Sequence, residues 1–332
     1  MPPATPPLTA RTSVATRLRV GDYEIVDRVG VGGVAEVYRA VRRKAGQAPT
    51  VVILKRMRKE TAADPFFSER FLAEADVVQM LRHPNVVGGL EVGNHGGVPH
   101  VVLDYVDGRD LAALISASCA AGSGLDLSTA IFVVTELLRG LHYVHTLKSP
   151  GGRDLRIVHR DVTPDNVLIG YDGTVALTDF GIALLDGIEA PPDEPRVAGK
   201  LAYLAPEQAA GAPLDHRADV FAAGCILYEL TVGVSPFSPD PGESEEQVME
   251  RVREARFLRP SKMAPDYPRE LEKVVLKALE KKPRSRFQDA DDLRVELEGL
   301  MLAEPWARDE LGTTMRTLFR REYEATRLPA LE

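Results

Sequence analysis

The sequence has little of what marks a disulfide-rich, membrane-spanning or nucleic-acid-binding protein. Only two of its 332 residues are cysteines, Cys119 and Cys225, and they lie far apart without the spacing of metal ligands. It has no run of about 18 uncharged apolar residues, which a membrane span needs, and residues 1–16 lack the apolar centre of a signal peptide. The net charge of −8 argues against nucleic acid as a partner. We therefore expect a globular protein of the reducing cytoplasm.

The apolar pattern divides the chain into a strand-rich first part and a helix-rich second part. Short apolar runs between turn residues predict strands at 23–29, 36–40, 51–55 and 100–105. One helix is predicted among them at 65–81, and Gly88 and Gly89 weaken a further strand at 86–92. Helical periodicity then covers 109–118, 128–147, 215–233, 244–255, 269–280 and 288–303. Strands followed by helices predict an α+β fold.

The two ends of the chain differ from the part between them. Residues 1–19 begin with a stretch rich in Pro, Thr and Ala and are expected to form a flexible arm. Residues 299–332 are expected to form a helical tail, with Leu311, Met315, Leu318 and Phe319 at helical spacing. Two interpretations of this tail stay open, namely an amphipathic appendage and a solvated tail helix.

Three weak signals occur in the strand-rich part. A glycine-rich stretch at 30–37 lies between two predicted strands, and glycines let a backbone approach phosphate groups and offer N–H donors to them. An apolar run ends in Lys55, and Glu74 lies on the predicted helix that follows. Each signal alone is typical of a hairpin turn, an edge-strand lysine or a solvated helix residue. Only their order along the chain points to a site.

A second group of motifs in the helix-rich part is far more specific. In chain order the motifs are His159-Arg160-Asp161 with Asn166, then Thr178-Asp179-Phe180-Gly181, and then Ala205-Pro206-Glu207. This set resembles the eukaryotic-like protein kinase family. The phrases at 35–40 and 205–208 resemble the bacterial serine/threonine kinases within it, and the resemblance covers residues 20–298.

The resemblance implies a bilobal α+β protein kinase fold with an ATP cleft between its lobes. The N-lobe would span 20–106 and the C-lobe 107–298. ATP and Mg2+ are the implied cofactors. Lys55 would hold the α and β phosphates and pair with Glu74. Asp161 would accept the proton of the substrate hydroxyl or orient that hydroxyl, while Asn166 and Asp179 would bind magnesium.

The resemblance also implies which residues surround the nucleotide. The loop 30–37 would cover the phosphates, Val37 and Leu168 would sandwich the adenine, residues 103–106 would form the hinge, and Asp110 would reach the ribose. The full implied set is Val29, Gly30, Val31, Gly32, Gly33, Val34, Ala35, Glu36, Val37, Ile53, Lys55, Leu103, Asp104, Tyr105, Val106, Asp110 and Leu168. Outside the cleft, Glu207 with Arg286, and Asp219, match residues that tie the substrate-side loop and the catalytic loop to the helical lobe.

Four positions depart from the family pattern. Ala35 replaces the third glycine of the loop, and Ile53 replaces a small alanine over the adenine. Thr163 stands where the family has a lysine near the γ-phosphate, and Lys200 stands where it has a threonine. Two interpretations of the second pair stay open. They are either two independent losses in a weak enzyme, or an exchange that still places one cation and one hydroxyl beside Asp161.

The segment 182–198 bears on regulation because it contains no Ser, Thr or Tyr. In the family, an arginine at the position of Arg160 commonly grips a phosphorylated residue of this segment. Carboxylates can pair with an arginine, although they carry less charge than phosphate. The carboxylates available in the segment are Asp186, Glu189, Asp193 and Glu194. We therefore expect the segment to be ordered without phosphorylation.

The resemblance implies a serine/threonine protein kinase that acts on protein substrates. The alternative is a catalytically weak pseudokinase that binds ATP or acts as a scaffold, and the presence of Lys55, Asp161 and Asp179 favours catalysis. The long stretch from 179 to 207 argues against a small-molecule kinase, and Pro164 argues against a tyrosine kinase. The physiological substrate, the upstream signal and the oligomeric state stay open.

Overall fold

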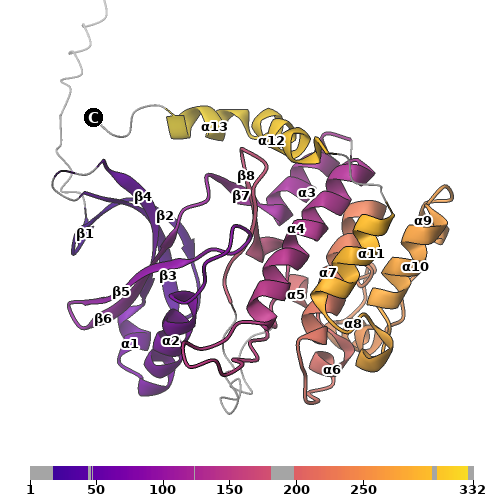
Figure 1. Cartoon of the computed structure of the whole chain (residues 1–332), viewed down its shortest axis with the longest axis horizontal. Coiled ribbons are helices and arrows are strands. Elements are labelled where there is room, and N and C mark those ends of the chain that lie inside the picture. Colours follow the sequence, from indigo (N-terminus) through magenta and orange to yellow (C-terminus); the bar gives the residue numbers. More distant parts are fainter. Residues whose placement is uncertain are drawn as a thin grey trace, which may run out of the picture.

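The chain folds into two lobes, one built mainly on a sheet and the other mainly on helices (Figure 1). The computed structural model describes residues 18–43, 46, 48–122, 124–180, 198–300 and 305–327. The predicted bilobal α+β architecture is confirmed. Most of the expected arm, residues 1–17, lies outside the described residues.

The N-lobe is a six-stranded antiparallel sheet in the order β1-β2-β3-β4-β6-β5. Two helices, α1 (Lys59–Ala62) and α2 (Pro65–Val78), connect β4 to β5. All four predicted strands and the predicted helix of this lobe are present. The strands are β1 (Arg19–Val20), β2 (Tyr23–Val31), β3 (Ala35–Arg42), β4 (Thr50–Met57), β5 (Gly89–His95) and β6 (Val98–Asp104).

Strand β5 corrects the expectation that Gly88 and Gly89 would weaken a strand here. The strand begins at Gly89 and runs to His95, three residues later than the start predicted at residue 86. A Cβ atom on Gly89 would lie 2.9 Å from the backbone nitrogen of Gln79 and 3.0 Å from the carbonyl carbon of Val78. The glycine is therefore needed for the strand to pass the end of α2, because a side chain would collide with that backbone.

The C-lobe is mainly helical, with a small three-stranded sheet on the side of the hinge. The sheet has the order β7-β8-β9 and contains β7 (Gly108–Asp110), β8 (Val167–Gly170) and β9 (Val175–Leu177). The helices are α3 (Leu111–Ala120), α4 (Leu127–His145), α5 (Ala198–Leu201), α6 (Pro206–Ala209), α7 (Arg217–Val232), α8 (Glu245–Arg253), α9 (Pro260–Met263), α10 (Arg269–Ala278) and α11 (Ala290–Gly299). Short 3-10 turns lie at Pro164–Asn166 and Pro283–Ser285.

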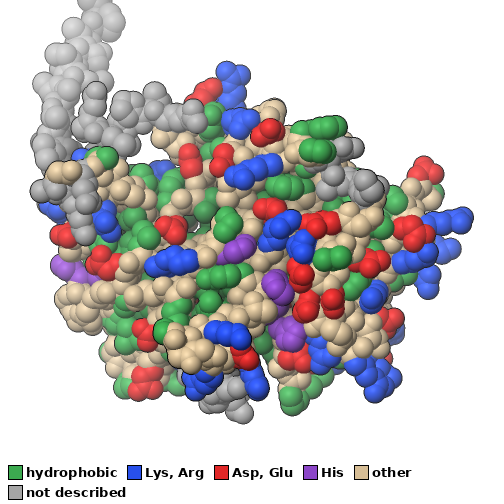
Figure 2. Space-filling model, viewed as in Figure 1, with side chains coloured by type: hydrophobic (Ala, Val, Ile, Leu, Met, Phe, Trp, Pro, Cys, Tyr) green, Lys and Arg blue, Asp and Glu red, His purple; other side chains and the backbone are tan. Residues whose placement is uncertain are grey.

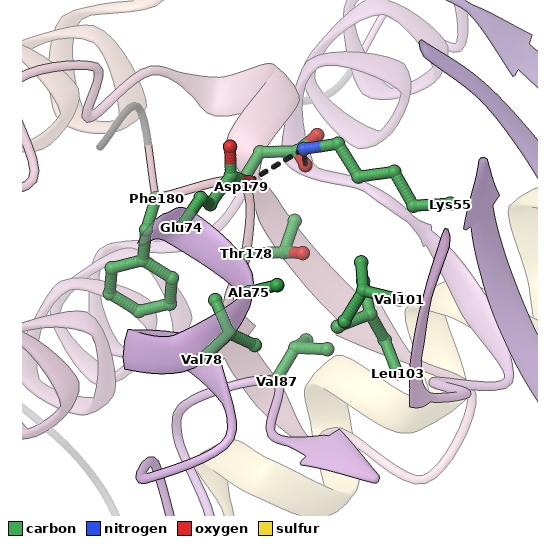
Figure 3. Close-up of a pocket in the computed structure, with 10 residues that line it drawn as sticks. All are labelled: Lys55, Glu74, Ala75, Val78, Val87, Val101, Leu103, Thr178, Asp179 and Phe180. Atoms are coloured by element: carbon green, nitrogen blue, oxygen red, sulfur yellow. Dashed lines mark hydrogen bonds and ion pairs between the residues drawn. The ribbon is translucent and has the colours of Figure 1, made fainter. Parts of the chain in front are cut away.

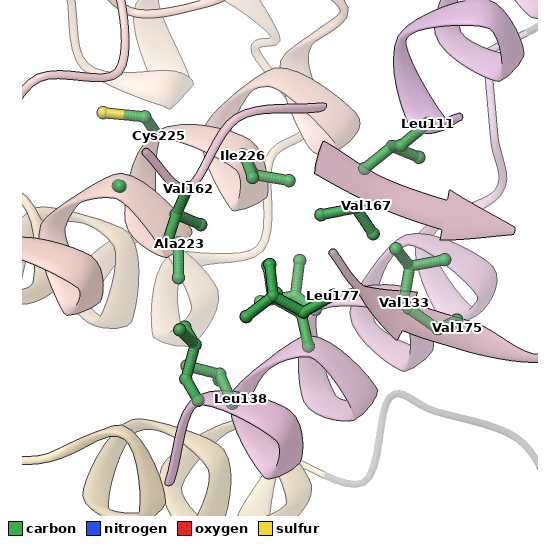
Figure 4. Close-up of a cluster of buried hydrophobic side chains, with 14 of the residues drawn as sticks. Leu111, Val133, Leu138, Val162, Val167, Val175, Leu177, Ala223, Cys225 and Ile226 are labelled. Atoms are coloured by element: carbon green, nitrogen blue, oxygen red, sulfur yellow. The ribbon is translucent and has the colours of Figure 1, made fainter. Parts of the chain in front are cut away.

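The core of the C-lobe forms where α4, α7 and the small sheet meet (Figure 4). Val133 and Leu138 from α4, Val167 from β8, Leu177 from β9 and Ile226 from α7 all point into this cluster and are fully buried. The strands that follow the catalytic loop are thus fixed against the two central helices. This packing gives the catalytic loop a rigid base.

Helix α4 is long and apolar enough to cross a membrane, and among the described residues it is the one helix that meets this test. In the fold, 61% of its apolar window is buried. It packs against α7, α11 and β9. A helix buried in the core of a globular protein passes the same length and composition test as a membrane span.

The tail forms two further helices, α12 (Ala307–Leu318) and α13 (Arg320–Arg327), which lie across the C-lobe and extend toward the N-lobe (Figure 1). Leu311 and Met315 are completely buried, and Phe319 is 7% exposed. The buried face of α12 agrees with an amphipathic helix and differs from a solvated one. Residues 301–304 and 328–332 lie outside the described part of the chain.

Candidate active site

Lys55 is the centre of the candidate site. Along β4, Val52 and Leu54 face a small apolar cluster on the outer side of the sheet, so the alternation of a strand turns Ile53 and Lys55 to the inner side. Lys55 Nζ lies 2.8 Å from Glu74 Oε1 and 3.0 Å from Asp179 Oδ1 (Figure 3). Three residues that are far apart in the sequence therefore meet in one charged group.

Glu74 reaches this group because of the helix that carries it. Helix α2 begins at Asp64, which accepts a hydrogen bond from the backbone N–H of Phe66, and Pro65 follows at the first helical position. Phe71, Ala75 and Val78 form its buried face. Glu74 lies beside them at a spacing of three from Phe71, so it faces the sheet.

In the group formed by Lys55, Glu74 and Asp179, the opposite charges favour the ionised form of Lys55 and of Asp179. Burial alone lowers the pKa of Lys55, but the carboxylates of Asp179 and Glu74 outweigh burial and raise that pKa above its usual value. The charge of Lys55 is the main cause that lowers the pKa of Asp179, against the opposing effect of burial. Both side chains are therefore charged at neutral pH, which is the state that a phosphate clamp and a cation ligand need.

A small pocket lies next to this charged group, and its wall is mainly apolar (Figure 3). Its residues come from β4, α2, β6, the segment before β5 and the segment after β9. They are Lys55, Glu74, Ala75, Val78, Val87, Val101, Leu103, Thr178, Asp179 and Phe180. Phe180 is buried, and its ring lies 4.8 Å from the ring of His159. The predicted hinge residue Leu103 and the charged residues thus share one wall.

The glycine-rich stretch forms the hairpin between β2 and β3. Gly30 pairs with Val37 and Val31 pairs with Glu36, while the backbone N–H of Gly32 donates to Ala35 O at 2.8 Å. The other members of the stretch divide by exposure. Val29 and Val31 are exposed, Gly33 is exposed, Val34 packs on the core, and Ala35 is buried.

The side chains of Val37 and Glu36 in this hairpin lie on opposite sides of the sheet. Val37 pairs with Lys55 across β3 and β4, which places it beside the charged group. The side chain of Glu36 instead accepts hydrogen bonds from Arg28 and Tyr38. It lies on the outer side of the sheet, so only its backbone belongs to the loop over the cleft.

The predicted adenine and hinge residues lie at the junction of the lobes. Ile53 pairs with Leu103 across β4 and β6, and Leu168 pairs with Asp110 across β7 and β8. Asp110 also begins α3, because its carboxylate accepts a hydrogen bond from the N–H of Ala113. Residues of both lobes therefore converge on one side of the hinge.

The three remaining hinge residues have different surroundings. The side chain of Asp104 is exposed, and its backbone N–H donates to Gly88 O at 3.0 Å. Tyr105 donates its hydroxyl to Asp107 Oδ1 at 3.2 Å, and Val106 packs against the main core. The hinge is thus held by a backbone hydrogen bond at Asp104, a side-chain hydrogen bond at Tyr105 and apolar packing at Val106.

Asp161 and Asn166 lie together in the catalytic loop. Asn166 Nδ2 donates to both the backbone oxygen and Oδ2 of Asp161, each at 2.8 Å. The N–H of Asp161 donates to His159 Nδ1, and His159 Nε2 lies 3.1 Å from the carbonyl oxygen of Thr178. Burial lowers the pKa of His159, which fits a neutral ring that accepts at Nδ1 and donates at Nε2.

Asp219 anchors this loop from α7. Its carboxylate accepts the backbone N–H groups of His159 and Arg160, both at 2.8 Å, and it lies 2.8 Å from His145 Nε2. Burial raises the pKa of Asp219, but these hydrogen bonds and neighbouring histidines outweigh burial and lower it. Arg160 has φ of +68°, a left-handed conformation that this anchoring holds in place.

Lys200 and Thr163, two of the departures from the family pattern, have different surroundings. Lys200 Nζ lies 2.5 Å from Asp161 Oδ2. Thr163 is buried in the catalytic loop, and its hydroxyl has no hydrogen-bond partner among the described residues. The cation at position 200 thus reaches the Asp161 carboxylate, while the described part of the chain offers the Thr163 hydroxyl no donor or acceptor.

The donor set fits a magnesium ion that arrives with phosphate groups. Asp179 supplies a carboxylate, and the amide oxygen of Asn166 remains for a cation because its Nδ2 is bound to Asp161. No cluster of three or more His, Cys, Asp or Glu that could hold a metal occurs in the described part of the chain. Magnesium usually takes one or two protein carboxylates plus substrate phosphates, which matches this pair.

The substrate-side loop is tied to the helical lobe by Glu207 and Arg286. The two side chains form a bidentate pair with both distances at 2.7 Å, and the Arg286 side chain is fully buried. Gln208, next to Glu207, donates its amide to Arg160 O at 2.9 Å. The substrate-side loop and the catalytic loop are therefore connected directly.

Sequence patterns did not assign roles to Gln208 or His145. Both act through tertiary contacts, Gln208 with Arg160 and His145 with Asp219. The one available signal was the position of Gln208 directly after the Ala-Pro-Glu motif. Gly181 and the acidic segment 182–197 lie outside the described residues, so the expected pairing of that segment with Arg160 stays a prediction.

Comparison with known families agrees with this arrangement. A protein kinase domain model matches residues 23–294. The chain belongs to the protein kinase family. The kinase is 34% identical over 297 residues to the tyrosine-protein kinase MasK of Myxococcus xanthus. It is also 34% identical over 282 residues to the serine/threonine-protein kinase PknB of Mycolicibacterium smegmatis.

The alignments cover most of this kinase but less than half of the relatives. They take in 90% of the chain and 46% of MasK, and 83% of the chain and 42% of PknB. Among solved structures, the kinase domain of Mycobacterium tuberculosis PknI matches with a TM-score of 0.62 and 26% identity. That match covers 87% of this chain and 99% of the PknI domain. The predicted kinase fold is thereby confirmed.

Proposed function

We propose that this chain transfers the γ-phosphate of ATP, with Mg2+, to serine or threonine hydroxyls of protein substrates. The observation that carries the proposal is Lys55, which is paired at once with Glu74 and Asp179. A phosphate clamp and a cation ligand are thus already held in one place. Such preorganised charge is what phosphoryl transfer requires from a protein. We propose 20–298 as the extent of the catalytic domain.

In this mechanism each charged group has one task. Lys55 holds the α and β phosphates, and Glu74 fixes the position of Lys55. Asn166 and Asp179 would hold magnesium, which would neutralise charge on the phosphates. Asp161 orients the acceptor hydroxyl and takes its proton as the hydroxyl oxygen bonds to the γ-phosphorus, while the bond from that phosphorus to the bridging oxygen breaks and ADP leaves. The loop 30–37 covers the phosphates, and the adenine lies between Val37 and Leu168.

Lys200 and Thr163 complete the transfer site in this proposal. The contact of Lys200 with Asp161 supports an exchange of residue types over two independent losses. The ammonium group of Lys200 would neutralise charge on the transferring phosphoryl group. The hydroxyl of Thr163, which is buried, would then gain a partner from the bound substrate.

The test is transfer from γ-labelled ATP to the kinase itself or to a generic protein such as myelin basic protein or casein. We expect transfer with magnesium and none after chelation. Lys55→Ala and Asp161→Asn should each lower the rate by a factor on the order of 10² or more. The matched control is Lys262→Ala, which removes an exposed lysine of α9. Near wild-type rates in either site variant, with the fold intact by circular dichroism, would refute the assignment of these residues, whereas no transfer by the wild type would favour a scaffold.

Tyrosine is a second candidate acceptor. The similarity to MasK, whose name gives it as a tyrosine-protein kinase, supports this reading. Pro164 after Thr163 and the similarity to PknB support serine or threonine. Phosphoamino-acid analysis of the labelled product separates the two, and phosphotyrosine as the main product would reverse our assignment.

We also propose protein partners and a cytoplasmic location, without a nucleic-acid partner. Lys and Arg side chains lie scattered among Asp and Glu side chains on the viewed face, so they form no basic patch there (Figure 2). Cys119 and Cys225 are both free thiols, which suits a reducing compartment. Cell fractionation with an antibody against the chain tests the location.

A further inference from the structure

We propose that the tail helices, α12 and α13, hold the small sheet β7-β8-β9 in its working position, with Gly312, Arg316 and Arg109 as positioning residues for nucleotide binding. This inference rests on the proposed function, because Leu168 and Asp110 of that sheet are the proposed adenine and ribose contacts. The tail lies beyond residue 294, where the match to the kinase domain model ends. Its role is therefore a property of this chain's own residues.

Helix α12 is packed like a core element. Ala307, Leu311 and Met315 follow a spacing of four along one face and are completely buried, and Phe319 continues that face. The helix contacts α3, α4 and β8. Burying such a row of apolar side chains stabilises the docked position of the helix.

A glycine lets α12 approach the turn between β8 and β9. A Cβ atom on Gly312 would lie 3.0 Å from the carbonyl carbon of Asp172 and 3.1 Å from the nitrogen of Gly173. Glycine inside a helix costs about 1 kcal/mol relative to alanine. Here it permits a backbone-to-backbone contact that a side chain would push apart.

Two arginines of α12 bind the same turn. Arg316 donates to the backbone oxygen of Tyr171, and Arg308 donates to Thr174 Oγ1 at 2.9 Å. The backbone N–H of Tyr171 in turn donates to Asp107 O at 2.9 Å. Through Tyr171, the tail is therefore two hydrogen bonds away from the residue that directly follows the hinge.

Helix α13 and the end of α12 hold the other edge of the sheet. Arg109 on β7 lies over the ring of Phe319 at 5.1 Å and forms an ion pair of 3.6 Å with Glu322. The rings of Tyr171 and Tyr323 meet at 5.0 Å. Burial and the nearby carboxylate of Glu322 raise the pKa of Tyr171 to about 12, as expected for a covered residue.

These contacts fix the strands that carry the nucleotide contacts. Asp110 directly follows Arg109, and it pairs with Leu168 across β7 and β8. The tail contacts this sheet at its β7 edge and at the β8–β9 turn. A shift of α12 or α13 would move Asp110 and Leu168 together, whereas the partners of Lys55 are Glu74 and Asp179 and those of Asp161 are Asn166 and Lys200. The tail should thus affect nucleotide affinity and leave the transfer step alone.

The experiment uses the full chain with Gly312→Ala and the larger Gly312→Val. We expect the Kd for ADP with magnesium, and the KM for ATP, to rise by about fivefold or more in Gly312→Val, the low end of coupling between linked sites. The value of kcat should not change. Gly312→Ala should lie between wild type and Gly312→Val. Hydrogen exchange should become faster at 108–110 and 168–170.

The matched controls are Gly299→Ala and Gly299→Val. Gly299 is also helical, but nothing lies within 4 Å of its added Cβ, so both variants should bind as wild type does. Arg109→Ala should repeat the effect of Gly312→Val, and Arg109→Lys, which keeps the charge, should restore most of the affinity. A variant that merely loses folded protein would lower kcat at unchanged KM.

The outcomes separate the two proposals. If wild type binds ADP with magnesium and Gly312→Val binds it equally well, the role of the tail is overturned and the kinase proposal stands. An effect confined to kcat overturns the role of the tail as well. If wild type binds no nucleotide, the proposed function fails, and this inference fails with it.

Discussion

Residue 200 is a lysine where the family pattern has a threonine, and it lies against Asp161, the proposed catalytic residue. Lys200 contacts Asp161, while the Thr163 hydroxyl is buried within the catalytic loop. The flexible four-carbon stem of lysine makes this delivery possible. We expect Lys200→Ala to lower kcat by a factor on the order of 10², because a cation is removed from the transferring phosphate. Steady-state kinetics at saturating ATP measure the effect.

The double variant provides the control for this prediction. Thr163→Lys alone should reduce kcat because two ammonium groups would compete for Asp161. Adding Lys200→Thr should restore much of the loss, since residues in contact show non-additive effects. An unchanged kcat in Lys200→Ala, or a double variant no better than the sum of its parts, would contradict the exchange.

Asp219 gives a prediction about pH. Its folded pKa is lowered, so its contribution to stability is complete above the unfolded pKa of about 3.9 and is lost as pH falls through the folded value. Asp219→Asn should lower the free energy of unfolding by about 3 kcal/mol at pH 7, because charge-assisted hydrogen bonds to 159 and 160 are weakened. Urea denaturation from pH 7 to pH 3 should show the difference between the proteins shrinking below about pH 4. A difference that stays constant to pH 3 would show that the charge contributes nothing.

The helices and strands that the sequence predicted are the long ones, and the shortest strands were not predicted. The 19-residue α4 and the eight-residue β4 carry enough residues for their period to be recognised. Strands β7 and β9 have three residues each and β1 has two, so no alternation could reveal them. Their positions depend on pairing partners such as Gly108 with Gly170, which are distant in the sequence.

The same limit applies to the site. The order of motifs along the sequence identified Lys55, Glu74 and Asp179, because each motif contains a residue type that the chemistry requires. It could not show that Glu36 turns to the outer side of the sheet or that Gln208 binds Arg160. Those features depend on strand registers and loop contacts, which one sequence does not display.

The segment 182–198 offers a prediction at the scale of one element. Since it lacks hydroxyl side chains, activity should not require phosphate there. Phosphatase treatment should leave kcat unchanged, and peptide mapping after incubation with ATP should find phosphate only outside the segment. Loss of activity on treatment, traced to a bordering residue such as Thr178 or Tyr203, would contradict the prediction. Phosphorylation of Tyr203 would also have to break a hydrogen bond, because its hydroxyl donates to Glu229 at 2.6 Å.

For the whole molecule, the two lobes share one hydrophobic core cluster and are joined by hydrogen bonds beside the cleft. Asn85 donates its amide to Glu136 and to Val175 O, and Val87 donates its backbone N–H to Leu177 O. Lys55 adds an ion pair with Asp179 across the lobes. A ligand that fills the cleft binds groups from both lobes, so it should stabilise them as one unit.

Binding of ADP with magnesium should therefore raise Tm by several degrees. At 100 times Kd the stabilisation is about 2.7 kcal/mol. The shift should be small without magnesium and in Asp179→Asn, because that change removes the carboxylate ligand. Asp161→Asn should keep the full shift and yet lose phosphoryl transfer, since Asp161 acts on the acceptor hydroxyl and holds no part of the nucleotide. Differential scanning calorimetry of the three proteins measures the shifts. If Asp161→Asn also loses the shift, Asp161 contributes to nucleotide binding, and the division of roles between the two aspartates is wrong.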